Sequence, residues 1–250
     1  MLRHWLLAIG KHSLHEPFIY DFYREVISNQ SLHEDFSRIE ALRNAYRQDR
    51  KKRDLNTLGA LSQQGKRSFR QLAIGGSTNP SYARILYHIT QFLNTENVIE
   101  LGTSLGFTSL YLSSDPKVRL LTLEGDPILI KEAGKQFTAM QRQNIKLIEG
   151  NIDETLDPVL EELNRVDMMY IDANHRYDPT IRYFDQALKY IHEESVLIFD
   201  DIHWSVEMSQ AWDKIRNDDR VTLSIDLYQF GIIFFKPFRQ KYHYRIDKRG

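Results

Sequence analysis

The stretch VIELGTSLGFT, Val98–Thr108, decides the fold. An apolar run at residues 97–101 is followed by a turn with two glycines and then by residues 104–113, which suit a helix. This order predicts a strand, a glycine turn and a helix, the usual nucleotide contact at the carboxyl edge of an open parallel sheet. A dinucleotide fingerprint would place glycines at 102, 104 and 107, but this chain has Gly102, Ser104 and Phe107. The turn therefore favours a nucleoside ligand without the pyrophosphate of NAD.

The rest of the chain extends this pattern into a sheet. Further short apolar runs lie at residues 119–123, 145–149, 166–172 and 195–200, separated by segments long enough for helices, such as 128–141 and 180–191. Repeated strand and helix units predict a parallel sheet with right-handed crossovers. Residues 221–228 and 231–235 instead predict an antiparallel hairpin, because only a tight connection separates them. We expect a doubly wound, mostly parallel sheet whose last strand is antiparallel.

The residues before this sheet predict a separate layer. Apolar residues at helical spacing indicate two or three amphipathic helices within residues 1–46: Trp5 and Ile9, then Phe18, Phe22 and Val26, then Phe36, Ile39 and Leu42. Residues 47–78 are polar and basic and predict a loop or lid, whereas Asn79 and Pro80 predict the start of a helix. We divide the chain into a helical cap with a basic loop (1–79), a ligand-binding domain (80–236) and a basic tail (237–250).

Composition narrows the class of protein. The chain has 250 residues, 42% of them hydrophobic, with a formal net charge of -1 and no cysteine. Disulfides and thiolate chemistry are thereby excluded. Without a run of about 20 apolar residues or a signal-peptide pattern, we expect no membrane association and a cytoplasmic location. Eight basic residues against two acidic ones between Arg47 and Arg70 predict a solvated basic face, with nucleic acid as the less favoured partner.

The next strand ends in an acid that fits a nucleoside. Glu124 stands at the tip of the run LTLEGDP, where a carboxylate can accept hydrogen bonds from both ribose hydroxyls. The alternative is that such an acid caps the following helix. Glu124 therefore indicates a nucleoside without identifying it.

These motifs together resemble those of the class I S-adenosylmethionine-dependent methyltransferases. The run ELGTSLGFTSL from Glu100, the run EGDP from Glu124 and the run EGNI from Glu149 look most like the catechol and caffeoyl-CoA O-methyltransferase group, whose first loop has the form E-x-G-x-x-x-G-[FY]-[ST]. The resemblance covers about residues 80–236. It implies a Rossmann-like sheet of seven strands with the last antiparallel.

The resemblance also implies positions for the cofactor, S-adenosyl-L-methionine. Glu100 and residues 102–106 would face its amino acid part, Glu124 its ribose, and Asn151, where the family more often has Asp, its adenine. The full set that we expect to contact the cofactor is Glu100, Gly102, Thr103, Ser104, Gly106, Thr108, Glu124, Gly125, Asp126, Asn151, Ile152 and Asp172.

Acids at two later strand ends suggest the chemistry. Asp172, Asp200 and Asp201 would converge over the same cleft, and clustered carboxylates need protonation or a cation such as Mg²⁺. Metal-dependent members of the family have D-A-D-K followed by Asp-Asn, where this chain has D-A-N-H and D-D. We predict Asp172, Asp200 and Asp201 as ligands if a divalent cation binds. The alternative is that Asp200 or Asp201 caps the following helix and that His203 and Trp204 form a wall of the pocket. His175 stands where the family has lysine, and its ordinary pKa of about 6.5 suits a general base.

We therefore expect an enzyme, an O-methyltransferase that transfers a methyl group to an oxygen or nitrogen of a small-molecule acceptor. Three alternatives stay open: a methyltransferase acting on RNA or another macromolecule, a nicotinamide oxidoreductase, and a non-catalytic nucleoside-binding scaffold. The identity of the acceptor and the formation of a homodimer are left open by the sequence.

Overall fold

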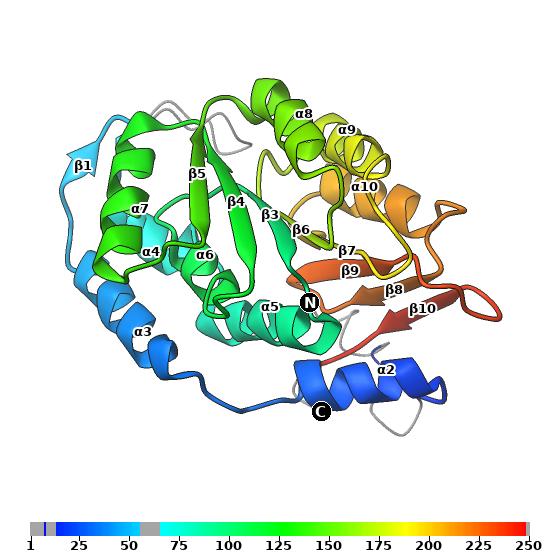
Figure 1. Ribbon diagram of the computed structural model, residues 1–250. Helices are drawn as coiled ribbons and strands as arrows, with labels where there is room; N and C mark the ends of the chain where they lie inside the picture. Colours follow the sequence, from blue (N-terminus) through cyan, green and yellow to red (C-terminus); the bar gives the residue numbers. More distant parts are fainter. Residues whose placement is uncertain (1–7, 9–13, 56–65, 249–250) are drawn as a thin grey trace.

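The computed structural model describes residues 8, 14–55 and 66–248, and its centre is one mixed sheet of eight strands (Figure 1). In sequence order the strands are β3 (Asn97–Leu101), β4 (Arg119–Glu124), β5 (Ile145–Glu149), β6 (Met168–Ile171), β7 (Val196–Asp200), β8 (Leu223–Asp226), β9 (Phe230–Phe234) and β10 (Tyr242–Arg245). Their order across the sheet is β10-β8-β9-β7-β6-β3-β4-β5. The chain thus runs outward from β3 to β5 and then crosses to β6 on the other side, so a crossover point lies between β3 and β6.

The predicted mostly parallel sheet with an antiparallel final hairpin strand is confirmed. β9 runs antiparallel to both β7 and β8, whereas the other paired strands are parallel. The sheet has one strand more than expected, because β10 pairs in parallel with β8. This strand comes from the segment that we assigned to a basic tail, where Tyr242 and Tyr244 alternate with more polar residues.

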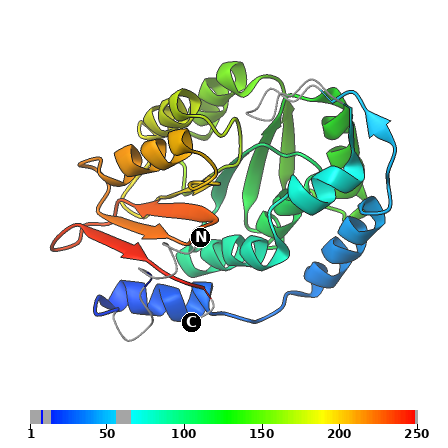
Figure 2. The ribbon, with the colours of Figure 1, turned by 180° about the vertical axis from the view of Figure 1, so that it is seen from behind.

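Helices cover both faces of the sheet (Figures 1 and 2). They are α2 (Pro17–Phe22), the π-helical turn η2 (Tyr23–Ile27), α3 (Glu34–Tyr46), α4 (Phe69–Gly75), α5 (Pro80–Leu93), α6 (Phe107–Leu112), α7 (Pro127–Ala139), α8 (Ile152–Leu163), α9 (Tyr177–Ala187) and α10 (Val206–Arg216). Helices α8, α9 and α10 pack on one face, while α5 and η2 pack on the opposite face near the centre. Across the described ranges, no helix is both long and apolar enough to cross a membrane.

The N-terminal helices share the core of the sheet. Phe18 and Phe22 of α2 pack against Phe92 of α5 and Phe234 of β9, with ring centroids 5.3 to 5.7 Å apart. Predicted helices at residues 17–27 and 34–46 are therefore confirmed, whereas the pair Trp5 and Ile9 lies outside the described residues. The division of the chain at residue 79 stays a prediction.

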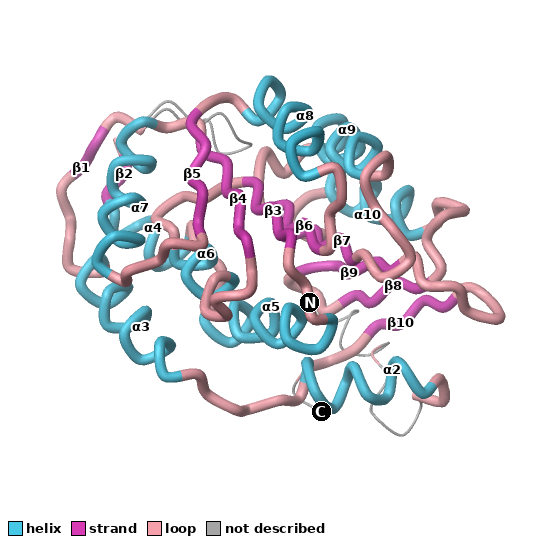
Figure 3. Tube along the Cα trace, viewed as in Figure 1, coloured by secondary structure: helices cyan, strands magenta, loops and turns pink. Residues whose placement is uncertain are grey.

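The basic residues of the predicted loop or lid follow α3 in the sequence and precede α5. This segment contains α4 and a short antiparallel pair of strands, β1 (Lys52–Arg53) and β2 (Arg67–Ser68), which are labelled in the tube view (Figure 3). Helix α4 begins with a capping box, because Ser68 and Gln71 bond each other's backbone N–H groups. Described parts of the predicted loop thus contain regular structure.

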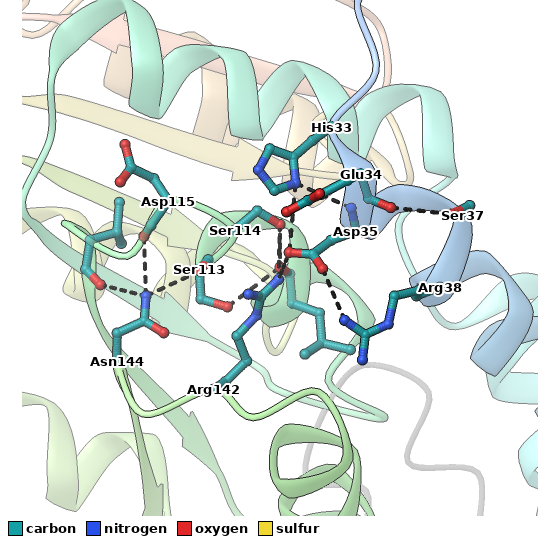
Figure 4. A network of polar contacts seen from close by, with 12 residues as sticks. His33, Glu34, Asp35, Ser37, Arg38, Ser113, Ser114, Asp115, Arg142 and Asn144 are labelled. Atoms are coloured by element: carbon teal, nitrogen blue, oxygen red, sulfur yellow. Dashed lines mark hydrogen bonds and ion pairs between the residues drawn. The ribbon is translucent and has the colours of Figure 1, made fainter.

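A polar network fixes the start of α3 to the loops at the amino edge of the sheet (Figure 4). Arg142 donates to Asp35 at 2.6 Å and to Ser114 at 3.2 Å. Asn144 donates to three backbone carbonyls, of Ser113, Asp115 and Val118. Because charge-assisted bonds are stronger than neutral ones, this network anchors α3 beside α6.

Candidate active site

The glycine turn connects β3 to α6 with backbone angles that disfavour side chains. Gly102 has φ +96°, Ser104 has φ +50° and Gly106 has φ +80°. A Cβ at Gly102 would lie 2.2 Å from the carbonyl oxygen of Asp172, so the turn touches the end of β6. The sequence places a glycine at the point where two strand ends approach most closely.

Glu124, at the end of β4, is held against this turn. Its Oε2 accepts the backbone N–H of Ser104 at 2.8 Å, and its Oε1 accepts those of Gly125 and Asp126, each at 2.9 Å. Burial raises the pKa of Glu124, although the three N–H donors act in the opposite direction. The carboxyl group thus has a fixed orientation at the strand end predicted for ribose.

A cavity of about 440 Å³ opens at the carboxyl edge of the sheet, beside the glycine turn. Its volume lies within the usual range for small-molecule sites. Ten of the predicted residues line it: Gly102, Ser104, Glu124, Gly125, Asn151, Ile152, Asp172, His175, Asp200 and Asp201. The structure thereby brings the predicted cofactor residues and the later acids into one space.

Five predicted residues lie behind this lining: Glu100, Thr103, Gly106, Thr108 and Asp126. Glu100 is 0% exposed; its Oε2 accepts from Ser109 and from Thr122, while its Oε1 has no partner among the described residues. Burial raises the pKa of Glu100 to about 8, so its side chain is protonated at neutral pH. Through its bonds to Ser109 and Thr122, Glu100 connects α6 to β4 next to the glycine turn.

Asp126 and Thr103 have structural contacts of their own. Asp126 caps α7 by accepting the N–H groups of Ile128 and Leu129 at 2.7 and 3.0 Å. Thr103 bonds Thr122 at 2.6 Å beneath the turn. The contribution of these residues to the site is to shape its backbone, and their direct contact with a cofactor stays a prediction.

His175 and Asp172 form the polar centre of the cavity. His175 Nε2 lies 3.3 Å from Asp172 Oδ1. Burial lowers the pKa of His175, but Asp172 and the nearby charges of Asp201 and Asp200 outweigh it and raise the pKa to about 9. The predicted pKa near 6.5 is therefore wrong for this surrounding, and the imidazole carries a proton at neutral pH.

Asp200 is bound by protein donors. Its Oδ2 accepts from Tyr170 at 2.6 Å, and its Oδ1 accepts from Gln229 at 3.0 Å and from the backbone N–H of Asp201 at 2.9 Å. Burial and the neighbouring carboxylates Asp172 and Asp201 raise the pKa of Asp200 to about 8. Hydrogen bonds from Tyr170 and Gln229 to Asp200, and the charge of His175 beside Asp201, lower the pKa values of these two acids but do not outweigh burial.

The donor set does not fit the predicted cation site. Within the parts of the chain that the structure describes, no group of three or more acidic or histidine side chains is placed to hold a metal ion. Asp172 is directed to His175, and Asp200 is directed to Tyr170 and Gln229. The three-aspartate cation site stays a prediction without support from this arrangement.

Arg67, Ile74 and Gln229 are among the lining residues that were not predicted. Ile74 and Trp204 are 56% and 57% exposed and give the cavity an apolar rim. His203, next to Trp204, instead bonds Asp226 at 2.9 Å. Trp204 lines the cavity, as the alternative to a metal site proposed, whereas Gln229 lies in a hairpin turn without a motif.

Comparison with known proteins is consistent with this geometry. A family model described as a methyltransferase domain matches residues 99–202, from β3 to the turn after β7. An uncharacterised protein of Acanthamoeba polyphaga mimivirus is 30% identical over 56% of this chain and 67% of its own length. A catechol O-methyltransferase of Niastella koreensis is 28% identical over 50% of this chain and 58% of its own length. The chain thus spans 58% to 67% of the length of these curated relatives.

Solved structures share the fold. A methyltransferase of Podospora anserina, solved with S-adenosylhomocysteine bound, superposes with a TM-score of 0.62 and covers 92% of this chain and 100% of its own, at 16% identity. At this identity the likeness concerns the fold alone. In sequence and in fold, the chain is thus similar to class I S-adenosylmethionine-dependent O-methyltransferases.

Proposed function

We propose that the chain transfers a methyl group from S-adenosylmethionine to an oxygen, or a nitrogen, of a small-molecule acceptor. The observation that carries the proposal is that the glycine turn, Glu124 and the pair Asp172 and His175 line one cavity. The turn and Glu124 suit a nucleoside, and the pair suits a proton transfer next to it.

The cofactor is supported by the shape of the turn. Glu124 Oε2 accepts one N–H and so keeps an acceptor site for a ribose hydroxyl. Ser104 and Phe107 stand where NAD-binding turns have glycine, which disfavours a pyrophosphate. The Podospora anserina methyltransferase with bound S-adenosylhomocysteine supports the same choice by fold.

The chemistry requires alignment and removal of one proton. The bond between sulfur and the methyl carbon breaks as the acceptor oxygen bonds that carbon, leaving a thioether, and the hydroxyl proton leaves. His175 is the proposed proton acceptor. Its pKa of about 9 must fall for this role, and the positive sulfonium of a bound cofactor would lower it, because like charges disfavour the protonated form.

The acceptor class follows from the rim of the cavity. Ile74 and Trp204 offer apolar surface at its mouth, next to the polar pair at its centre. An aromatic ring that carries a hydroxyl group matches both features. The name of the Niastella koreensis relative, a catechol O-methyltransferase, supports this class. No step is assigned to a metal ion.

Calorimetric titration with S-adenosylhomocysteine and with NAD tests the cofactor. We expect micromolar binding of the former, about -8 kcal/mol, and none of the latter. Glu124→Gln should weaken it by about tenfold or more, because a charged acceptor is lost. Glu149→Gln is the matched control, since Glu149 pairs in register with Glu124 on the neighbouring strand but does not line the cavity. Binding of NAD alone would refute the proposal.

A methyl-transfer assay with hydroxylated aromatic acceptors tests the reaction. We expect His175→Gln to lower kcat by about 100-fold or more, the usual contribution of general base catalysis. His192→Gln is the control, because His192 also pairs with an aspartate, Asp167 at 2.8 Å, away from the cavity. A wild-type protein that binds S-adenosylhomocysteine but methylates only RNA, with affinity that falls steeply with salt, would move the proposal to a macromolecular acceptor.

A further inference from the structure

A buried chain of hydroxyl groups runs behind the cavity, from the helix after the glycine turn to the acid at the end of β7. Thr108 Oγ1 donates to Thr78 Oγ1 at 3.1 Å, Thr78 Oγ1 lies 2.9 Å from Tyr170 Oη, and Tyr170 Oη donates to Asp200 Oδ2 at 2.6 Å. Since the Tyr170 proton is used on Asp200, Thr78 donates to Tyr170. The donors therefore all point toward Asp200, an arrangement in which each bond polarises the next.

Tyr170 is the centre of this chain. It is fully buried in β6, on the face that packs against α5, and does not line the cavity. The two residues that bond its hydroxyl group, Thr78 and Asp200, do line the cavity. A buried hydroxyl is unfavourable unless it is bonded, so a phenylalanine would suffice for packing alone. The hydroxyl thus has a role beyond filling the core.

One partner of the Tyr170 hydroxyl, Thr78, belongs to a wall of the cavity. Residues 74–79, from the last residues of α4 to the residue before α5, line the cavity, and the side chains in this segment form mainly local bonds. Ser77 bonds the carbonyl of Leu72, and Asn79 caps α5. Thr78 by contrast reaches across to the sheet through Tyr170. The hydroxyl of Tyr170 therefore joins this wall to the sheet.

We propose that Tyr170 is a positioning residue, which fixes the wall at residues 76–79 and Asp200 in one arrangement before the ligand binds. A wall that is already ordered spares the ligand the free energy of ordering it, so affinity rises without a new contact. The proposal rests on the proposed function for the identity of the ligand, S-adenosylhomocysteine.

A double-mutant cycle tests the proposal by calorimetry with S-adenosylhomocysteine. Tyr170→Phe and Thr78→Val should each weaken binding by about 3- to 10-fold, the range expected for one hydrogen bond. The double variant should bind the ligand no more weakly than the single variant with the lower affinity, because both substitutions break the same connection. A purely structural role would not produce this non-additivity in affinity.

Tyr111→Phe is the matched control. Tyr111 is also fully buried and donates to a carboxylate, Glu40 at 3.0 Å, but neither residue lines the cavity. We expect a comparable loss of thermal stability with unchanged affinity. Unchanged affinity in Tyr170→Phe, or additive effects in the double variant, overturns the positioning role. Failure of the wild-type protein to bind S-adenosylhomocysteine instead overturns the proposed function, so the two failures are distinguishable.

Discussion

The same substitution, glycine to alanine, should have opposite effects at two positions. In Gly102→Ala the new Cβ would lie 2.2 Å from the carbonyl oxygen of Asp172, at φ +96°. The left-handed backbone costs about 1–2 kcal/mol. Moving the Asp172 peptide also breaks its N–H bond to Leu101, which is 2.9 Å long, at about 1 kcal/mol. The expected loss of unfolding free energy is about 2–3 kcal/mol.

Gly134→Ala is the matched variant. Gly134 lies inside α7, its φ is not positive, and a Cβ there meets no atom within 4 Å. Alanine should stabilise the helix by about 0.5–1 kcal/mol, because glycine loses more backbone entropy on folding.

Thermal unfolding of both variants checks these values. At about 2–4 °C per kcal/mol for a chain of this size, Gly102→Ala should lower Tm by about 4–12 °C, and Gly134→Ala should raise it by about 1–4 °C. Only Gly102→Ala should also lose binding of S-adenosylhomocysteine. A Gly102→Ala protein with wild-type Tm and wild-type affinity would refute the close contact between the turn and the end of β6.

Three further predictions concern stability. Burial raises the pKa of Asp167, but two backbone N–H donors and other bonds outweigh it and hold the pKa below 3.8. Asp167→Asn should therefore lower the free energy of unfolding by about 1–3 kcal/mol at pH 7. The urea midpoints of the variant and the wild-type protein should converge as the pH falls below 4, because the wild-type carboxylate then becomes protonated. Burial raises the pKa of Glu100 to about 8, so the stabilisation by its protonated form is complete below pH 4.5 and is lost as the pH rises through 8. The Tm difference between Glu100→Gln and the wild-type protein should therefore shift in favour of the variant between pH 4 and pH 8. The same pH dependence of Tm in both proteins would contradict this. Glu40→Ala leaves the buried Arg43 without its partner at 3.1 Å and should cost about 3–5 kcal/mol in urea unfolding, whereas a loss below about 1 kcal/mol would contradict an effective ion pair.

The sheet could be predicted because its signals are local. The runs at residues 97–101 and 145–149 match β3 and β5 without a shift. β3 is almost fully buried and largely apolar, as expected for an inner parallel strand, whereas the edge strand β5 has apolar residues interspersed with exposed Lys146 and Glu149. Asn79 and Pro80 marked the start of α5 for a similarly local reason, a side-chain cap followed by a residue that needs no N–H partner. β10 was assigned to the tail because the strand has only four residues and some of them are polar.

The site was predicted in its residues more than in its chemistry. Strand-end positions brought Glu124, Asp172 and His175 to one edge, since the ends of parallel strands meet there. The pKa of His175 could not be derived in the same way, because it depends on burial, on the distance to Asp172 and on the charges of Asp201 and Asp200, which only the fold sets. The role of Tyr170 could not be predicted for the same reason, because its partner Asp200 is on another strand.

The position of β9 limits how the protein can be shortened. The matched methyltransferase domain, residues 99–202, ends just after β7, yet β7 bonds along its full length to β9, which lies outside that region. A fragment cut at the domain limits would leave Val196–Asp200, a strand buried on both faces, as an open edge. Unpaired apolar edges recruit other chains, so such a fragment should aggregate, and the shortest useful fragment must extend at least through Phe234.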